Sequence, residues 1–402
     1  MDSFLATRLS CVKPSPSMAA KARVDSLRAA GRTIIDFTIG EPDFPTPAHI
    51  VAAGIDALKS GQTRYTGSSG TPLLRQAIAE KLRRENALTY SPDEIVVGNG
   101  AKHIIYNAFA ATLNDGDEVI IPAPYWVSYP DMVTINGGTP VIVSCDASTG
   151  FKLTPQALER SITARTRWLI LNTPNNPTGA VYSRSELEGL CGVLLRHPHV
   201  WLMTDEIYEH FVYGQARHLS PLQIAPELSS RTLLVNGVSK AYAMTGWRIG
   251  YGAGPRQLIK AIGLLFSQST TCPGAMSQAA AAIALGGPQQ CVAQGAALFA
   301  ARRDRMTELL QQIPGIGCAI PDGAFYVFPS VAGLIGKTTR QGLRLSTDVD
   351  VMTFLLEEAG VATIDGTSYG HSPYLRMSFA TSAEQIELGC NLIRAAVDQL
   401  TD

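Results

Sequence analysis

The sequence lacks a long hydrophobic run and an excess of charge of one sign. No stretch approaches the roughly 20 consecutive apolar residues of a membrane-spanning helix, and 33 basic residues nearly balance 34 acidic ones. The first 24 residues also lack the apolar core of a secretory signal peptide. These absences argue against a membrane protein, and against nucleic acid or a membrane surface as the main partner.

Cysteine is sparse and follows no recognisable pattern. The chain has an odd number of cysteines and no C-x-x-C spacing; the seven are Cys11, Cys145, Cys191, Cys272, Cys291, Cys318 and Cys390. A disulfide framework and a thiolate zinc site are therefore not expected. We predict that the protein has no metal site and lies in the reducing cytoplasm.

Short apolar runs alternate with helical patterns over the middle of the chain. With 402 residues, 46% of them hydrophobic, the chain has enough apolar material for two domains. Strands are predicted at residues 94–98, 117–122, 139–145, 166–172, 200–208, 231–237 and 247–254, with helices at 101–113 and 183–195. This alternation indicates an α/β fold with a mostly parallel sheet covered on both faces.

The last part of the chain has a different pattern. Residues 302–313 form an amphipathic helical pattern, whereas residues 323–330, 360–366 and 374–380 are strand-like. Strands and helices are segregated here, which favours a smaller α+β domain.

Two cations stand in an otherwise uncharged segment, "NGVSKAYAMTGWRIGYGAG" at residues 236–254. Lys240 follows an apolar strand at its carboxyl end, where loss of hydration would lower the pKa of its amine and make it a nucleophile. Arg248 needs an anion, and phosphate suits its planar fork. A surface lysine is an equally good interpretation of this segment by itself, and a structural carboxylate partner is the alternative for Arg248.

Three other strand ends offer weaker signals. Gly98, Gly100 and Ala101 lie between a strand and a helix, so the helix start would bind a phosphate. The spacing lacks the last glycine of a dinucleotide-binding fingerprint. The remaining candidates fit ordinary turns, caps or packing equally well, and they are Asn176, Asp205 with Tyr208, and the loop aromatics Trp126 and Tyr129.

The order of these segments is more specific than any of them alone. "GEPDF", "PYWVSYP", "NTPNNPTGAVY", "TDEIYEH" and "SKAYAMTGWRIGY" follow one another along the chain. In this order they resemble the class I aminotransferases of fold type I, which use pyridoxal 5′-phosphate. More narrowly, the chain resembles the bacterial aspartate aminotransferases of the Thermus and rhizobial type, from about residue 13 to about residue 382.

The resemblance implies a role for each cofactor-binding position. Lys240 would bond to the cofactor aldehyde, and the other catalytic residues would be Asp205, paired with the pyridine nitrogen, and Tyr208, which with Asn176 holds the 3′-oxygen. Trp126 would stack on the ring. The phosphate would be bound by Gly100, Ala101, Lys102, Arg248 and, from the neighbouring subunit, Tyr65.

The resemblance also implies the substrate site. Arg376 and the backbone at Gly40 would hold the α-carboxylate, with Trp126 and Asn176 beside it. The position three residues before the lysine is Gly237, where many relatives have a serine or threonine. No arginine matches the one that reads the distal carboxylate in enteric and animal enzymes, so Lys102 is the candidate, assisted by Ser15 and Ser17.

The implied protein is a homodimer with shared active sites. Its large domain, residues 49–290, would contain a seven-stranded, mostly parallel sheet and bind the cofactor, and both chain ends, 1–48 and 291–402, would form the small α+β domain. It would move an amino group between an L-amino acid, aspartate or glutamate, and 2-oxoglutarate or oxaloacetate by ping-pong kinetics. The Ala123–Pro124 and Asn176–Pro177 bonds are expected to be cis.

Other functions remain open at this point. The same fold carries transaminases for aromatic amino acids, alanine or prephenate, and β-lyases. A nicotinamide dehydrogenase is disfavoured by the missing glycine. A non-catalytic regulatory module that binds the cofactor is disfavoured because the N-terminal segment lacks the basic charge of a DNA-binding unit.

Overall fold

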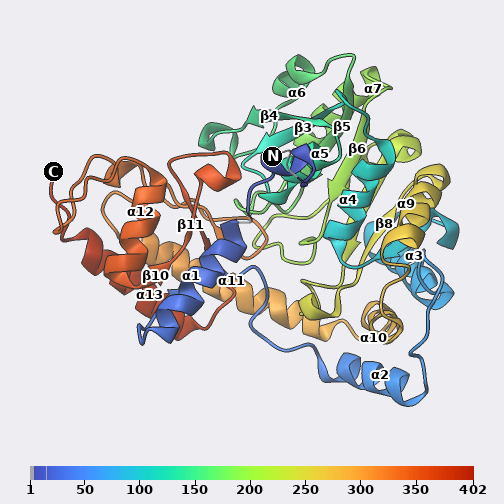
Figure 1. Ribbon diagram of the computed structural model, residues 1–402, viewed down its shortest axis with the longest axis horizontal. Coiled ribbons are helices and arrows are strands. Elements are labelled where there is room, and N and C mark those ends of the chain that lie inside the picture. Colours follow the sequence, from blue (N-terminus) through green and yellow to red (C-terminus); the bar gives the residue numbers. More distant parts are fainter. Residues whose placement is uncertain (1–3, 15) are drawn as a thin grey trace.

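The computed structural model describes residues 4–14 and 16–402, and a mixed sheet of seven strands is its largest element (Figure 1). The strand order is β2-β8-β7-β6-β5-β3-β4, and β8 alone runs antiparallel to its neighbours. The strands are β2 (Ile95–Gly98), β3 (Glu118–Ala123), β4 (Thr139–Ser144), β5 (Thr166–Asn172), β6 (Trp201–Asp205), β7 (Thr232–Gly237) and β8 (Gly250–Ala253). The predicted α/β fold with a mostly parallel, seven-stranded sheet is confirmed.

Helices cover both faces of this sheet, which explains the continuous apolar runs of its central strands. Val96 faces a core shared with α4 (Ala101–Thr112), α5 (Ser128–Ile135) and α9 (Arg256–Ser269). Its neighbours Ile95 and Val97 face the opposite core. The helices on that side are α3 (Pro72–Asn86), α6 (Pro155–Ser161), α7 (Arg184–Arg196), α8 (Pro221–Ile224), α10 (Ala275–Gly286) and, against α10, α2 (Ala48–Lys59).

A second group of elements brings the two ends of the chain together. β1 (Ile35–Asp36) pairs in parallel with β10 (Val361–Ala362), and β12 (Leu375–Ser378) lies between β11 (Ile364–Asp365) and β9 (Tyr326–Val327). Figure 1 shows α11 (Gln290–Gln311) running from the sheet side towards α1 (Pro16–Ala29), α12 (Asp348–Phe354) and α13 (Ala383–Val397). The division at residues 48/49 and 290/291 stays a prediction.

Several strand predictions differ from the structure at their ends. The strand predicted at 200–208 ends at Asp205. The strand predicted at 247–254 begins only at Gly250, because Arg248 has left-handed backbone angles (φ 57°) in the preceding turn. Residues 360–366 split into β10 and β11, which join different sheets. Residues 323–330 contain only the short strand β9, since Ala324 is also left-handed (φ 57°).

Several peptide bonds that precede a proline are cis. The Ala123–Pro124 and Asn176–Pro177 bonds are cis, as expected, and so are Thr173–Pro174 and Ser372–Pro373. Within the described ranges, no helix is long and apolar enough to cross a membrane.

Candidate active site

A cavity of about 520 Å³ opens at the carboxyl ends of β5 and β6. This is the edge at which open α/β sheets bind ligands, and the volume is typical of a small-molecule site. The second group of elements contributes Tyr326 and Arg376 to its wall. Most predicted site residues line it, namely Gly40, Ala101, Lys102, Trp126, Asn176, Asp205, Tyr208, Lys240, Arg248 and Arg376.

Lys240 is a half-buried amine in this wall. Its Nζ donates a hydrogen bond to the carbonyl oxygen of Gly40 at 2.6 Å and lies 5.7 Å from the centre of the Tyr208 ring. Burial lowers the pKa of the Lys240 amine to about 8, although the Glu41 carboxylate opposes this shift. A larger fraction of Lys240 than of an exposed lysine is therefore neutral and nucleophilic near neutral pH.

Two more cations and a helix start face the same part of the cavity. Arg248 donates to the carbonyl oxygens of Thr245 (2.8 Å) and Asn99 (3.2 Å), and no carboxylate in the described parts of the chain pairs with it. Burial, and then the Arg248 charge, lower the pKa of Lys102. Because the first amides of α4 also lack intrahelical acceptors, this corner suits a phosphate dianion.

Glycines allow the phosphate corner to close. A side chain on Gly100 (φ 91°) would overlap the Arg248 guanidinium, and one on Gly250 would overlap the backbone of Gly100 and Ala101. At Gly237 a Cβ would lie 2.9 Å from the carbonyl oxygen of Ile249. The missing serine or threonine at position 237 therefore has a steric reason, since β8 lies too close.

Asp205 is a buried carboxylate with no cationic partner among the described ion pairs. It accepts a hydrogen bond from the Tyr129 hydroxyl at 2.6 Å and one from the Ile207 amide at 3.3 Å. Burial raises the pKa of Asp205 to about 6, against the opposing effect of the Tyr129 bond. A protonated ring nitrogen would supply the missing positive charge.

Asn176 and Tyr208 present polar atoms beside Asp205. The backbone amide of Asn176 donates to Asn172 Oδ1 at 2.8 Å, and the Tyr208 hydroxyl lies 2.9 Å from the Tyr326 hydroxyl. Burial raises the pKa of Tyr208 well above its usual value, so this hydroxyl stays a donor. Both side chains can therefore bind an oxygen on the ring of a planar cofactor.

Trp126 extends the wall with an aromatic face. Its ring meets Tyr129 edge to face at 5.3 Å, and Lys102 Nζ lies 4.7 Å from its centre. The Trp126 ring, which is predicted to stack on the cofactor, thus also contacts the Lys102 ammonium group.

Arg376 is a buried guanidinium without a carboxylate. Its Nη2 donates to the carbonyl oxygen of Thr38 at 2.6 Å and its Nη1 to Asn176 Oδ1 at 3.3 Å, while its buried Nε has no partner. The side chain is 2% exposed and stacks on Tyr326 at 4.5 Å. A charge buried in this way calls for an anionic ligand, and a carboxylate matches its fork.

Four predicted residues are not placed in this cavity. Gly100 is not among the residues that line it, although its neighbour Ala101 is. Tyr65 is 87% exposed and lies outside the lining. Ser15 is outside the described residues, as is the side chain of Ser17.

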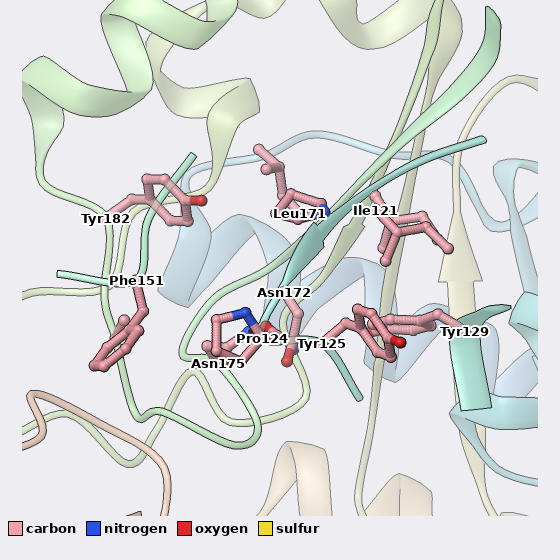
Figure 2. Close-up of a pocket in the computed structure, with 12 residues that line it drawn as sticks. Ile121, Pro124, Tyr125, Tyr129, Phe151, Leu171, Asn172, Asn175 and Tyr182 are labelled. Atoms are coloured by element: carbon pink, nitrogen blue, oxygen red, sulfur yellow. Dashed lines mark hydrogen bonds between the residues drawn. The ribbon is translucent and has the colours of Figure 1, made fainter. Parts of the chain in front are cut away.

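Several residues that hold the site together have no clear signal in the sequence. Tyr129 was interpreted as packing, and Asn172 and Tyr326 were not considered. Figure 2 shows a second, smaller cavity in which Tyr129 and Asn172 form part of the wall, and its volume of about 20 Å³ is of the order of one water molecule. Both residues line the large cavity too. The only sequence signal was their place next to the strand-end motifs.

The side chains fit pyridoxal phosphate as a ligand. The cavity has cations without carboxylates (Arg248, Lys102 and Arg376), a buried carboxylate without a cation (Asp205) and a partly neutral amine (Lys240). A phosphate, a protonatable ring nitrogen, an aldehyde and a substrate carboxylate complement these groups.

Comparison with known proteins identifies a family and close relatives. The family described as "Aminotransferase class I and II" matches residues 32–393. An aspartate aminotransferase of Rhizobium meliloti (strain 1021) is 50% identical over 396 residues, covering 98% of this chain and 97% of that protein. An aspartate/prephenate aminotransferase of Cereibacter sphaeroides is 52% identical over 392 residues, covering 98% of each.

Solved structures agree with these relatives. A Rhizobium meliloti aspartate aminotransferase superposes with a TM-score of 0.97 at 50% identity, covering 99% of this chain and 100% of that one. A Thermus thermophilus aspartate aminotransferase, solved with maleate, gives 0.91 at 40% identity over 98% and 100% of the two chains. The whole described fold is therefore shared.

The contact between Gly250 and the start of α4 can be tested by substitution. We expect Gly250→Ala to weaken binding of pyridoxal phosphate at least about tenfold, because its methyl group would push the helix start away from Arg248. Binding is measured by titrating the cofactor-free protein. Gly192→Ala on α7, where a Cβ meets nothing within 4 Å, is the control. Equal affinity in both variants would contradict the prediction.

Proposed function

This chain belongs to the class I and II aminotransferases, and we propose that it moves amino groups between aspartate or glutamate and 2-oxoglutarate or oxaloacetate. It is an enzyme that uses pyridoxal phosphate to transfer an amino group between an amino acid and a 2-oxo acid. The substrate choice is carried by one observation: Arg376 and Lys102 both line the cavity, and neither forms an ion pair within the described residues.

The relatives' names support acidic substrates. Several are named aspartate aminotransferases, and the Thermus structure was solved with maleate, a four-carbon dicarboxylate. In our proposal Arg376 holds the α-carboxylate beside Gly40. Lys102 then meets the distal carboxylate, which an alkyl side chain would fail to supply.

Lys240 moves the proton in the proposed reaction. When bound, pyridoxal phosphate supplies an aldehyde for the substrate amine and a ring that accepts the electron pair of the α-carbon. With a pKa of about 8, Lys240 Nζ takes the α-proton of the substrate as a general base. It then gives this proton up as a general acid. One site handles both substrates in turn, so the kinetics are ping-pong.

The other side chains bind and orient. Asp205 holds the ring nitrogen, Asn176 and Tyr208 hold the ring oxygen, and Trp126 covers the ring face. The phosphate is held by Arg248, the Gly100–Ala101 backbone and Lys102, which thus has a second possible role. Ser15 remains a predicted substrate contact.

Prephenate is a second candidate acceptor. The Cereibacter relative is named an aspartate/prephenate aminotransferase, and several Rickettsia relatives are named probable enzymes of the same kind. A panel of 2-oxo acids with glutamate as donor tests both candidates. Higher activity with aromatic donors than with aspartate would overturn the acidic substrates and leave the cofactor chemistry intact.

We also propose that the active species is a homodimer in the cytoplasm. Tyr65 does not line the cavity of its own chain and is 87% exposed, as a residue would be that serves a neighbouring site. The exposed apolar residues Ile55, Leu58, Leu73, Leu264 and Ile283 stand on α2, α3, α9 and α10, which lie on one side of the molecule (Figure 1). Exposed apolar side chains on these helices suit an isologous contact between two copies.

The role of Lys240 predicts a specific chemical loss. Lys240→Ala should abolish the borohydride-trappable bond to pyridoxal phosphate and nearly all transamination. Peptide mapping after reduction identifies the labelled lysine. Lys260→Ala, an exposed lysine on α9, should behave like the parent protein. A label on any other lysine would refute the assignment.

The role of Lys102 predicts a selective effect on substrates. Lys102→Ala should lower kcat/KM for aspartate at least about tenfold, roughly 1.4 kcal/mol, and affect alanine or phenylalanine less. The affinity for pyridoxal phosphate, measured separately, distinguishes loss of phosphate binding. An equal loss with every donor would assign Lys102 to the phosphate alone.

The dimer is tested by sedimentation of the active enzyme. We expect a dimer in the presence of substrate, and a Tyr65→Phe variant that stays dimeric but binds pyridoxal phosphate more weakly, since it lacks one hydroxyl donor. A fully active monomer would rule out the shared site.

A further inference from the structure

The turn that follows β6 has two faces, and only one of them belongs to the cavity. Asp205, Ile207 and Tyr208 line the cavity. Glu206 and Glu209 alternate with them and are 0% and 9% exposed. Two carboxylates buried directly behind the proposed cofactor residues are costly unless they are fully paired.

Glu209 is bonded by three donors from two other elements. Lys81 Nζ on α3 contacts its Oε1, which also accepts from Asn236 Nδ2 on β7 at 2.6 Å. Asn86 Nδ2, at the end of α3, donates to its Oε2 at 2.7 Å. Lys81 is 1% exposed and also donates to Asn86 Oδ1 at 2.8 Å. Although burial opposes ionisation, the Lys81 charge holds the pKa of Glu209 well below its usual range.

Glu206 is held in the same way at the other end of the turn. It accepts from Thr204 Oγ1 at 2.9 Å and lies 3.0 Å from His218 Nε2, in a pair of buried side chains. Burial lowers the pKa of His218, but the Glu206 charge and hydrogen bond outweigh it and raise the pKa above its usual value. The backbone amide of Glu206 also donates to Val235 on β7 at 2.9 Å.

We propose that Glu206 and Glu209 are positioning residues that fix the turn from behind, so that Asp205 and Tyr208 keep the geometry needed to hold the cofactor ring. The inference rests on the proposed roles of Asp205 and Tyr208. After Asp205 the chain forms a turn with backbone hydrogen bonds from Glu209 to Glu206 (2.9 Å) and from Phe211 to Tyr208 (2.8 Å), and the contacts to α3 and β7 attach this turn to the rest of the fold. The cavity face itself offers Asp205 only hydrogen-bond donors, namely the Tyr129 hydroxyl and the Ile207 amide.

Other interpretations of the cluster are weaker. Glu206, Glu209 and His218 offer oxygen and nitrogen atoms within 4.8 Å of one another, a spacing that would suit a metal ion. However, the Lys81 ammonium already contacts Glu209, and His218 already faces Glu206. A divalent cation would have to displace buried positive charge, so the cluster is better described as ion pairs.

The test compares two buried carboxylates. Glu209→Gln keeps the side-chain shape but turns one acceptor into a donor that faces Asn86 or Lys81. Glu118→Gln is the control, since Glu118 is 5% exposed, bonded to Thr163 (2.6 Å) and Arg165 (2.8 Å), and stands at the beginning of β3, away from the cavity. Both variants should unfold at a lower temperature than the parent protein.

Only Glu209→Gln should change cofactor binding. We expect its dissociation constant for pyridoxal phosphate to rise at least about tenfold, and kcat to fall by a similar factor, while KM for aspartate stays near the parent value because Arg376 lies outside the turn. The pH titration of the bound cofactor's visible absorbance should also shift. Affinity, kcat and titration that match those of Glu118→Gln would overturn the inference.

A second variant covers a failure to fold. Lys81→Met/Glu209→Met removes both charges of the pair, a replacement that buried ion pairs often tolerate, and it also removes the bonds to Asn86 and Asn236. The same weakening of cofactor binding is expected, and parent-like affinity would overturn the inference. A parent protein that fails to bind pyridoxal phosphate would instead contradict the proposed function.

Discussion

Charge buried without its counter-charge is the constraint on which this site depends. Arg376 and Asp205 are buried in the wall of one cavity without an ion-pair partner in the described chain, and the more exposed Arg248 and Lys102 line the same cavity. The two buried charges would destabilise the fold if the cavity stayed empty of ions. They are tolerable because a phosphate, a ring nitrogen and a carboxylate restore the balance, so ligand binding and site stability are linked.

The buried carboxylates on the two faces of the turn after β6 differ in their partners. Towards the cavity, Asp205 has hydrogen-bond donors but no cation, and the Tyr208 hydroxyl is bonded only to the Tyr326 hydroxyl. Behind them, Glu206 and Glu209 are satisfied entirely by protein groups. The satisfied face is rigid, which gives the open face a defined geometry before any ligand arrives, and preorganisation of this kind reduces the cost of binding.

Close backbone contacts place the cations. Gly100 and Gly250 let the start of α4, β8 and Arg248 approach more closely than any side chain would permit. At Gly237 the nearby β8 backbone leaves little room for a hydroxyl. In our proposal the phosphate is bound by the side chains of Arg248 and Lys102 and by backbone amides at the start of α4, whose positions the helix fixes.

Sequence patterns determined the class of fold, because apolar runs buried on both faces of a sheet leave a clear period along the chain. The resemblance to a known family also pointed to Lys240, Arg248, Asp205 and Arg376, and all four line the cavity. The short strands β1, β9, β10 and β11 were predicted poorly, because two-residue strands have no period of their own.

Only the tertiary structure decided which residues support the site. Tyr129 reaches Asp205 across 76 positions of the chain, and Lys81 reaches Glu209 across 128. No local pattern records such distant pairs, and each partner alone has an ordinary interpretation as a packing aromatic or a surface charge. The proposed roles of these residues depend on their burial and on the hydrogen-bond partners that the fold places beside them. Both are properties of the packed chain.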